Sequence, residues 1–485
     1  MYRLRSKSGT MGLIRMYRPI LLLLWALACQ PTQPVAPDAP TPSPPVDTGT
    51  ITHAKPNILL VYTDQHRADS LGAAGHPVAI TPNLDSLADE GVMFNRMYTS
   101  GPVCRPARAA MMTGFYPHQV DVTTNFGEID PRGVSHVRRI RDEGGYHTAV
   151  VGKIHLYTGG GVHTEEFADR MHEYGWDDHF EQVGPTELSW RPTAYGDYLE
   201  SVTEPGQPSK LQRLNDYNAA YDFTYPGHDS PPWNIPTEDH ADVYCGRIAE
   251  EWVRERDPSK PFYLQLNFPG PHHPFDATQE YRDLYDSEDP DFPIPILVEP
   301  DDPTPPLILT LLDIKGVDWQ PAEARKLAAD YLAGVTLIDD ALGGVLQALE
   351  ETGELDNTWI IYSSDHGELL ADHWLTGKIA FYEGSWRVPL IIRPPHGIEP
   401  WQSEAFVDTV DMTASILAMA GLEPEPNAPG SQLVDKVLAG KHAPGADTHR
   451  DFIFGANMGN FAVRNEDWKL TYDDSLDNPR AVELY

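Results

Sequence analysis

The sequence predicts an α/β fold, with a largely parallel central sheet and helices on both of its faces. Three observations lead to this prediction. Short apolar runs alternate along the chain with longer segments in which apolar residues recur every three or four positions. The runs are apolar at almost every position, as expected for strands that are buried on both faces. Polar residues follow several runs, and ligands in such sheets bind beyond the carboxyl ends of the strands.

The alternation can be followed element by element. Apolar runs predict strands of the central sheet at Asn57–Thr63, His147–Val151, Phe262–Phe268, Trp359–Ser363 and Val388–Ile392. Helical periodicity predicts helices at Leu84–Asp89, Val137–Glu143, His240–Arg256 and Ala322–Glu351. From about Gly430 the pattern changes to short runs, Phe452–Phe454, Phe461–Val463 and Lys469–Tyr472, which predict a small antiparallel subdomain.

Residues 1–29 are typical of an export signal. Basic residues precede the short apolar run Ile20–Ala28, and Ala26-Leu27-Ala28 fits a small-x-small cleavage site. Cys29 follows directly, so the segment resembles a bacterial lipoprotein signal, and a lipid on Cys29 would be the only membrane attachment that we expect. The Pro-rich residues 30–55 predict an extended linker. No later stretch is predicted to span a membrane.

This order of segments predicts an exported bacterial protein that is periplasmic, anchored to the outer membrane or extracellular. Its catalytic or binding domain is expected at residues 56–430. The C-terminal subdomain is expected at residues 431–485, with an end that we expect to be truncated.

The overall charge restricts the partners of the protein. The formal net charge is −36, which argues against nucleic acid as a partner, because phosphate binding needs a basic surface. An anionic substrate would therefore need a local basic site that works against the overall field. The three cysteines are too few for a disulfide framework or a cysteine-based zinc site.

Two polar clusters follow predicted strands and could ligate a metal ion. Asp64 and Gln65 follow the first strand, and Asp365 and His366 follow the fourth. Carboxylate and amide oxygens suit a hard cation, and an Asp-His pair could complete such a site. Each cluster taken alone could equally be a loop that caps a helix.

A third cluster contains a cysteine at a predicted helix start. Pro106 suits a first helical turn and would place Cys104 at the helix N-terminus. There the helix dipole and Arg108 would stabilise negative charge on the group at position 104. The alternative is a small buried thiol beside a turn.

Further basic residues could bind an anion. Lys153 and His155 are expected on the same side of an extended segment, and Lys378 could contact substrate oxygens. His272, between a strand and a proline-flanked turn, is a candidate proton donor. Together with Arg108, these lysines and two more arginines would form the basic pocket that the net charge requires: Arg67, Arg105, Arg108, Lys153 and Lys378.

These residues together resemble the sulfatase family. Cys104–Arg108 matches its Cys-x-Pro-x-Arg signature, and Gly145–Leu156 is similar to its second signature. Thr63–Arg67 resembles its opening segment and Ser364–Glu368 its second metal-binding segment. The resemblance implies the alkaline phosphatase superfamily fold, in agreement with the predicted sheet.

The resemblance also implies a chemistry for the individual residues. One divalent cation, with calcium expected and magnesium or manganese as alternatives, would be held by Asp64, Gln65, Cys104, Asp365 and His366. A formylglycine-generating enzyme would convert Cys104 to formylglycine, whose hydrate is the nucleophile. Arg108 and Lys153 would stabilise that hydrate, and the remaining site residues would bind sulfate and protonate the leaving oxygen: His155, His272 and Lys378. Gln65 stands where many sulfatases have a second aspartate.

The expected activity is hydrolysis of a sulfate ester, either a sulfated carbohydrate or an aryl or alkyl sulfate. A phosphonate monoester hydrolase or phosphodiesterase of the same superfamily is an alternative, since Gln65 with His366 fits such enzymes as well. A non-catalytic binding lipoprotein is a second alternative. A chain in which Cys104 stays a thiol is a third.

Overall fold

The structure, a computed structural model, describes residues 55–159, 162–184, 191–220, 230–231, 233–297, 311, 318–473 and 481–484. These residues belong to one compact unit, His53–Tyr485. The predicted export signal, and all of the predicted linker except Lys55, lie outside the described residues.

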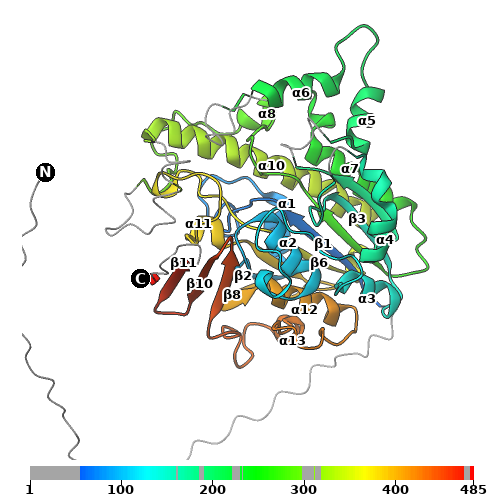
Figure 1. Cartoon of the computed structure of the whole chain (residues 1–485), viewed down its shortest axis with the longest axis vertical. Coiled ribbons are helices and arrows are strands. Elements are labelled where there is room, and N and C mark those ends of the chain that lie inside the picture. Colours follow the sequence, from blue (N-terminus) through cyan, green and yellow to red (C-terminus); the bar gives the residue numbers. More distant parts are fainter. Residues whose placement is uncertain are drawn as a thin grey trace, which may run out of the picture. The chain divides into compact units, whose positions relative to one another are not determined.

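An eight-stranded sheet forms the centre of this unit, in the order β4-β3-β5-β1-β6-β7-β2-β8 (Figure 1). The strands are β1 (Asn57–Thr63), β2 (Val92–Tyr98), β3 (His147–Lys153), β4 (Asp178–Gln182), β5 (Phe262–Asn267), β6 (Thr358–Ser364), β7 (Leu390–Arg393) and β8 (Trp401–Asp408). Only β7 runs antiparallel to its neighbours, β6 and β2. The predicted α/β fold with a largely parallel sheet is confirmed.

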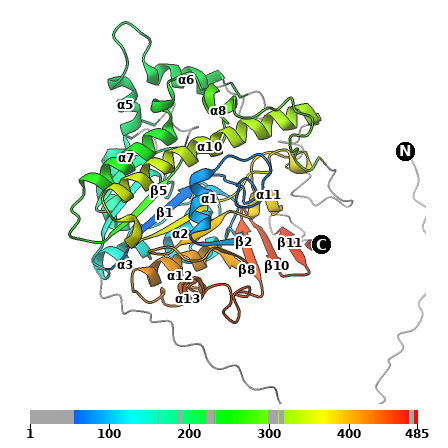
Figure 2. The same cartoon turned by 180° about the vertical axis from the view of Figure 1, so that it is seen from behind.

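The continuous apolar character of β1 follows from its burial on both faces. Ile58 and Leu60 contact one hydrophobic core, and Leu59 and Val61 contact the other. One core is covered by α2 (Cys104–Thr113), α3 (His136–Asp142) and α12 (Thr409–Met419). The other is covered by α1 (Pro82–Asp89), α7 (Ala241–Glu255) and α10 (Pro321–Glu351) (Figure 2).

Helix α10 corrects one prediction made from the sequence. It begins with Pro321, and Gln320 and Glu323 form a capping box at its N-terminus. The helix is long and apolar enough to cross a membrane, a property that we had not expected of any segment after the N-terminus. Most of its apolar stretch is buried inside the unit, where α10 packs against α7. The apolar residues therefore serve a protein core.

Three strands of the sheet, β2, β4 and β8, were missed by the sequence analysis. Strand β4 lies at a sheet edge, and Phe180 is its only apolar residue. In β2, Asn95 and Arg96 interrupt the apolar run. Strand β8 lies at the sheet edge and exposes Gln402 and Glu404, which gives it only a short apolar run. None of these strands shows the unbroken apolar run that identifies β1.

The predicted C-terminal antiparallel strands are present. Four strands form a second sheet: β9 (Ile453–Asn457), β10 (Asn460–Arg464), β11 (Lys469–Asp473) and β12 (Ala481–Leu484). This sheet is attached to the segment before α2, because the Ala456 amide donates to the Ser100 carbonyl at 2.9 Å. It thus lies close to the segment that carries Cys104.

A buried histidine connects α3 to the central sheet. His136 Nδ1 lies 3.0 Å from the Met112 carbonyl, and its Nε2 lies 2.9 Å from the Tyr263 hydroxyl. Burial lowers the pKa of His136 from 6.5 to about 4. The folded protein therefore holds this ring neutral at pH values where the unfolded chain binds a proton.

We predict that this histidine makes the fold less stable in mild acid. The contribution of neutral His136 to the free energy of unfolding is complete above the unfolded pKa of 6.5. It is lost as the pH falls toward the folded pKa of about 4. The loss at about pH 5 should be about 2 kcal/mol of unfolding free energy. Denaturant titrations at about pH 7.5 and about pH 5 should show a smaller decrease in a His136→Asn variant than in the wild type. Equal decreases would contradict the assignment.

Candidate active site

The carboxyl ends of β1 and β6 bring two acidic side chains together. These strands are adjacent and parallel, and Thr63 is paired with Ser364 at their ends. The Asp365 amide donates to the Thr63 carbonyl at 3.1 Å. Asp64 and Asp365, the next residues, are both fully buried. The sheet register therefore determines that the two carboxylates share one site.

Cys104 is the first residue of α2, as the sequence analysis predicted from Pro106. Its Sγ atom lies 3.3 Å from His366 Nε2 and 3.9 Å from Asp64 Oδ1. Burial and Asp64 act to raise the pKa of Cys104, but Lys378, Lys153 and His366 outweigh them and lower it to about 7. Negative charge at this position is therefore stabilised by its neighbours.

The hydrogen bonds of His366 determine which of its ring nitrogens carries the proton. Its Nδ1 lies 2.8 Å from the Gly367 carbonyl, which can only accept, so this nitrogen carries a proton. Its Nε2 lies 3.0 Å from Lys378 Nζ, which can only donate. With the proton on Nδ1, the lone pair of the ring is on Nε2, the nitrogen that lies beside Lys378 Nζ and Cys104 Sγ.

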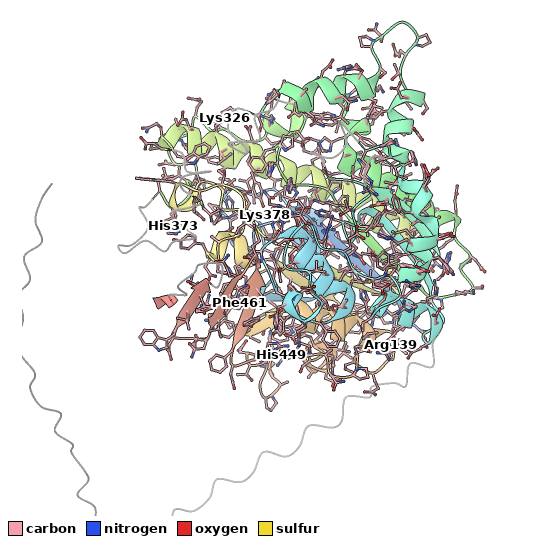
Figure 3. The ribbon with its side chains drawn as sticks, in the orientation of Figure 1. Arg139, Lys326, His373, Lys378, His449 and Phe461 are labelled. Atoms are coloured by element: carbon pink, nitrogen blue, oxygen red, sulfur yellow. The ribbon has the colours of Figure 1, made fainter. Side chains whose placement is uncertain are left out.

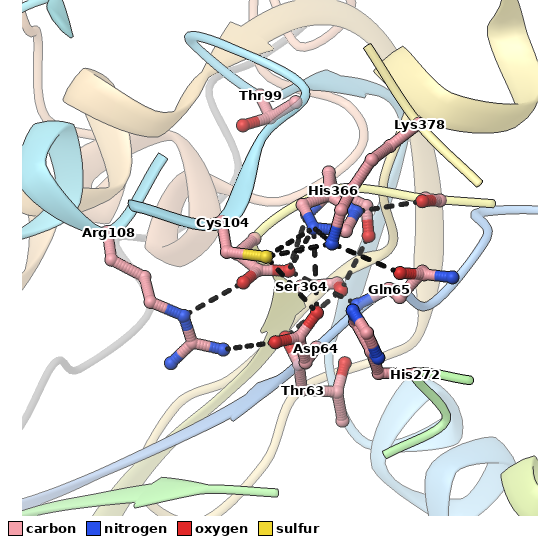
Figure 4. A network of polar contacts seen from close by, with 12 residues as sticks. Thr63, Asp64, Gln65, Thr99, Cys104, Arg108, His272, Ser364, His366 and Lys378 are labelled. Carbon is pink, nitrogen blue, oxygen red and sulfur yellow. Dashed lines mark hydrogen bonds and ion pairs between the residues drawn. The ribbon is translucent and has the colours of Figure 1, made fainter. Parts of the chain in front are cut away.

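Three cations lie around the carboxylates, and Figure 4 shows two of them, Arg108 and Lys378. Arg108 Nε lies 2.8 Å from Asp365 Oδ2, and Lys153 Nζ contacts Asp64 Oδ2. Lys378 Nζ lies 2.8 Å from Cys104 Sγ. Burial acts to raise the pKa of Asp64, but its cationic neighbours hold that pKa well below its usual range, with Lys153 the strongest of them. The carboxylate therefore stays charged inside the protein.

The segment that carries Lys153 requires a glycine before the lysine. Gly152 has a positive φ of 93°, and a Cβ atom there would lie 1.9 Å from the Asn267 carbonyl oxygen. Strand β3 ends at Lys153, and His155 has a left-handed φ of 55°. The prediction of an extended segment through His155 is therefore wrong. Burial and the positive charge of Lys153 lower the pKa of His155 well below 6.5, so the two side chains still interact electrostatically.

His272 and Gln65 lie on the other side of the cluster (Figure 4). His272 is buried in the loop after β5, and its Nδ1 lies 2.7 Å from the His273 carbonyl. Burial, His273 and Lys378 lower the pKa of His272 well below 6.5. Gln65 accepts a hydrogen bond from Lys378 Nζ through Oε1 at 3.2 Å.

Two arginines predicted for the basic pocket have other partners. Arg67 forms ion pairs with Asp69 and Asp372 and donates to backbone carbonyls of the loop after β6. Arg105 donates to the carbonyls of Gly127 and Tyr157. Both guanidinium groups therefore stabilise loops through these contacts. The part of the predicted pocket that meets the carboxylates is Arg108, Lys153 and Lys378.

The structure adds three residues that the sequence analysis did not assign. The Tyr62 ring lies 5.5 Å from the Arg108 guanidinium, Glu368 is buried beside Gln65, and Asn457 Nδ2 donates to the Ile379 carbonyl at 2.9 Å. Glu368 could have been found, because it lies in the Ser364–Glu368 motif. Asn457 gave no signal, because it belongs to the C-terminal sheet and supports the neighbour of Lys378 from far away in the sequence.

The donor set at the centre of the cluster fits a metal ion. Ligand atoms of Asp64, Cys104, Asp365 and His366 all lie within 4.8 Å of one another, and all four residues are buried. Two carboxylates and an outward lone pair on a histidine are suitable ligands for a divalent cation. The side chains as they stand could therefore enclose one ion.

An α/β sheet with a nucleophile position at a helix N-terminus, beside buried carboxylates and cations, defines a hydrolase of anionic esters. Comparison with known proteins gives the family. The sulfatase family profile matches residues 56–422. The chain belongs to the sulfatase family, within the alkaline phosphatase superfamily, and is a sulfatase enzyme by that membership.

Its relatives include proteins that are named for different activities. A multifunctional alkaline phosphatase superfamily protein of Trinickia caryophylli is 32% identical over 427 residues, which cover 82% of this chain and 80% of the relative. An arylsulfatase of Clostridium perfringens is 30% identical, with 85% of each chain covered. The crystal structure of a phosphonate monoester hydrolase of Agrobacterium radiobacter matches with a TM-score of 0.72 and 25% identity, over 89% of each chain.

We predict that Arg108→Met strongly destabilises the fold. The change would leave Asp365 without its 2.8 Å partner in a fully buried position. Removing one member of a buried ion pair costs about 3–5 kcal/mol, because an uncompensated charge remains. Chemical denaturation in the presence of a chelator measures the loss.

Lys326→Met provides the matched control for Arg108→Met. Lys326 pairs with Asp330 on α10, half exposed and away from Lys378 (Figure 3). Loss of such a pair should cost less than about 1 kcal/mol. Similar losses in the two variants would refute the view that Arg108 neutralises buried carboxylates.

Proposed function

We propose that the protein hydrolyses a sulfate ester to an alcohol and inorganic sulfate, with residue 104 as nucleophile and one divalent cation as cofactor. The observation that carries this proposal is the position of Cys104. Its Sγ atom lies within hydrogen-bonding distance of Lys378 and next to His366 and Asp64. The Sγ atom of the proposed nucleophile therefore lies beside both the candidate metal ligands and a cation that could bind the substrate.

The proposed cation is calcium, with magnesium or manganese as alternatives. It would be held by Asp64, Gln65, Asp365, His366 and residue 104, most of which offer the oxygen donors that calcium prefers. When bound, the cation supplies positive charge that polarises the ester and lowers the pKa of a coordinated hydroxyl. Arg108 and Lys153 pair with the two carboxylates and hold them in place.

The proposed nucleophile is formylglycine, made from Cys104 by a formylglycine-generating enzyme. Its hydrate would supply one hydroxyl to attack sulfur and a second whose deprotonation releases sulfate. The start of α2 suits this group, because the helix dipole stabilises negative charge there. Lys153 and Lys378, which already lower the pKa of the Cys104 thiol, would stabilise an alkoxide in the same way.

The leaving oxygen needs a proton, and the geometry favours Lys378 as its donor. Among the described residues, Lys378 Nζ is the nearest hydrogen-bonding partner of Cys104 Sγ, at 2.8 Å. His272 is held neutral by its lowered pKa, and its Nδ1 proton is directed at the His273 carbonyl. His272 Nε2 can then only accept a hydrogen bond, so we assign His272 to contact with the leaving alcohol and His155 to binding the anion.

A phosphonate monoester hydrolase or phosphodiesterase activity is the second candidate. A phosphonate monoester, a phosphodiester and a sulfate ester each carry one negative charge around a tetrahedral centre, so the same cations could bind all three. The similarity to a phosphonate monoester hydrolase supports this alternative.

We also infer from the sequence that the protein is exported and lipid-anchored through Cys29.

We predict that an aryl sulfate is hydrolysed with a higher kcat/KM than the matching phosphonate monoester and phosphodiester. The protein should be produced with a formylglycine-generating enzyme, and mass spectrometry of the Cys104 peptide should report the conversion. Cys104→Ala should abolish hydrolysis, and a chelator should suppress it until calcium is restored. A faster phosphonate or diester reaction would support the second candidate, and full activity with an unmodified cysteine would refute the formylglycine mechanism.

We predict that Lys378→Ala lowers kcat roughly 10²–10³-fold, the usual effect of removing one group that stabilises charge in a transition state. Its effect on the free energy of unfolding should be small in comparison. Lys326→Ala, on the exposed side of α10, is the control for the loss of a lysine. Wild-type turnover in the Lys378 variant would remove Lys378 from the site.

A further inference from the structure

We propose that Glu368 is a positioning residue that sets the orientation of the Gln65 side-chain amide, so that the amide oxygen faces the cation site. The inference rests on the proposed function, because it concerns the cation that Gln65 would help to hold. It adds a role for a residue that contacts neither the cysteine nor the two aspartates in the described contacts.

Glu368 is surrounded by hydrogen-bond donors. The side chain is fully buried in the loop that follows β6. Its Oε1 accepts from the backbone amides of Leu370, at 2.9 Å, and of Gly377. Its Oε2 accepts from Gln65 Nε2. Both oxygens thus act as acceptors, one for the backbone of the Lys378 loop and one for Gln65.

The orientation of the Gln65 amide follows from the chemistry of Glu368 and Lys378. A third neighbour, His273 Nδ1 at 3.5 Å from Gln65 Nε2, can accept or donate according to its tautomer and so does not decide the orientation. Glu368 Oε2 offers a lone pair, so the amide atom beside it must be the nitrogen. Lys378 Nζ can only donate, so the amide atom beside it, at 3.2 Å, must be the oxygen. Each of these two neighbours by itself therefore requires the same orientation of the Gln65 amide.

The rest of Gln65 is held in place. Its backbone amide donates to Asp365 Oδ1 at 3.1 Å, and its carbonyl accepts from the Tyr331 hydroxyl at 2.8 Å. The backbone on both sides of the side chain is therefore fixed. The side-chain torsions are restricted by the contacts of the terminal amide, with Nε2 beside Glu368 and Oε1 beside Lys378.

Glu368→Gln, a nearly isosteric change, should therefore reverse the amide. The oxygen of Gln at this position must stay with the amides of Leu370 and Gly377, so its nitrogen must face Gln65. Gln65 would then turn its oxygen toward residue 368 and its nitrogen toward Lys378. An NH₂ group cannot ligate a cation, so the site would lose one ligand.

The same reasoning predicts a specific rescue. In a Gln65→Glu, Glu368→Gln double variant, a carboxylate at position 65 can accept from the new amide with one oxygen and present the other to the cation. Gln65→Glu alone would place two carboxylates side by side in a buried position, so it should destabilise the protein without bound cation. Each substitution alone should therefore be unfavourable, whereas the two together should restore the cation site.

The test measures calcium affinity by calorimetry, and thermal unfolding in a chelator, for all variants with residue 104 in one chemical state. Glu368→Gln should bind calcium roughly 10–100-fold more weakly than the wild type. The double variant should regain most of that loss. Glu399→Gln, which removes an exposed carboxylate paired with Lys441, should bind calcium like the wild type.

The outcomes separate this inference from the proposed function. A wild type that binds no divalent cation overturns the proposed metal site itself. A wild type that binds calcium, with Glu368→Gln binding equally well or the double variant no tighter than Glu368→Gln, overturns only the role of Glu368. If Glu368→Gln does not fold, a folded double variant supports the coupling, and failure of both to fold overturns it.

Discussion

The burial of two carboxyl groups side by side is the constraint on which the rest of the site depends. Asp64 and Asp365 have no solvent exposure, and an unpaired charge in such a place costs several kcal/mol. Arg108 and Lys153 compensate for them from α2 and β3. With Lys378 the cluster has three cations for two anions, so an anionic ester can enter although the protein carries a net charge of −36.

Each charged group comes from a different part of the chain, and the sheet topology brings them together. Strands β1 and β6 are neighbours at the centre of the sheet, and β3 lies one strand further, beyond β5. All of these strands run parallel, so their carboxyl ends meet at the same edge. Helix α2 begins at that edge with Cys104 and adds its dipole to the field of the cations.

The C-terminal sheet supports the site from outside the strand ends. Asn457, at the end of β9, donates to the Ile379 carbonyl, and the Ile379 amide donates to the Pro102 carbonyl at 3.1 Å. The residue after Lys378 is thus linked both to the C-terminal sheet and to the segment before Cys104. Glu368 holds the other end of the same loop through the Gly377 amide. The distance between Lys378 and Cys104 therefore depends on contacts that no local motif describes.

The sequence alone determined the α/β class, most central strands, the helix start at Cys104 and the residues that gather around it, because buried parallel strands and strand-end polar clusters leave local patterns. It could not give β2, β4 or β8, because polar residues interrupt or replace the apolar run in each of them. It also misjudged Arg67 and Arg105, whose guanidinium groups bind loop carbonyls and carboxylates. The tertiary structure decided which charges meet and how the Gln65 amide turns, because those properties depend on partners that are distant in the sequence.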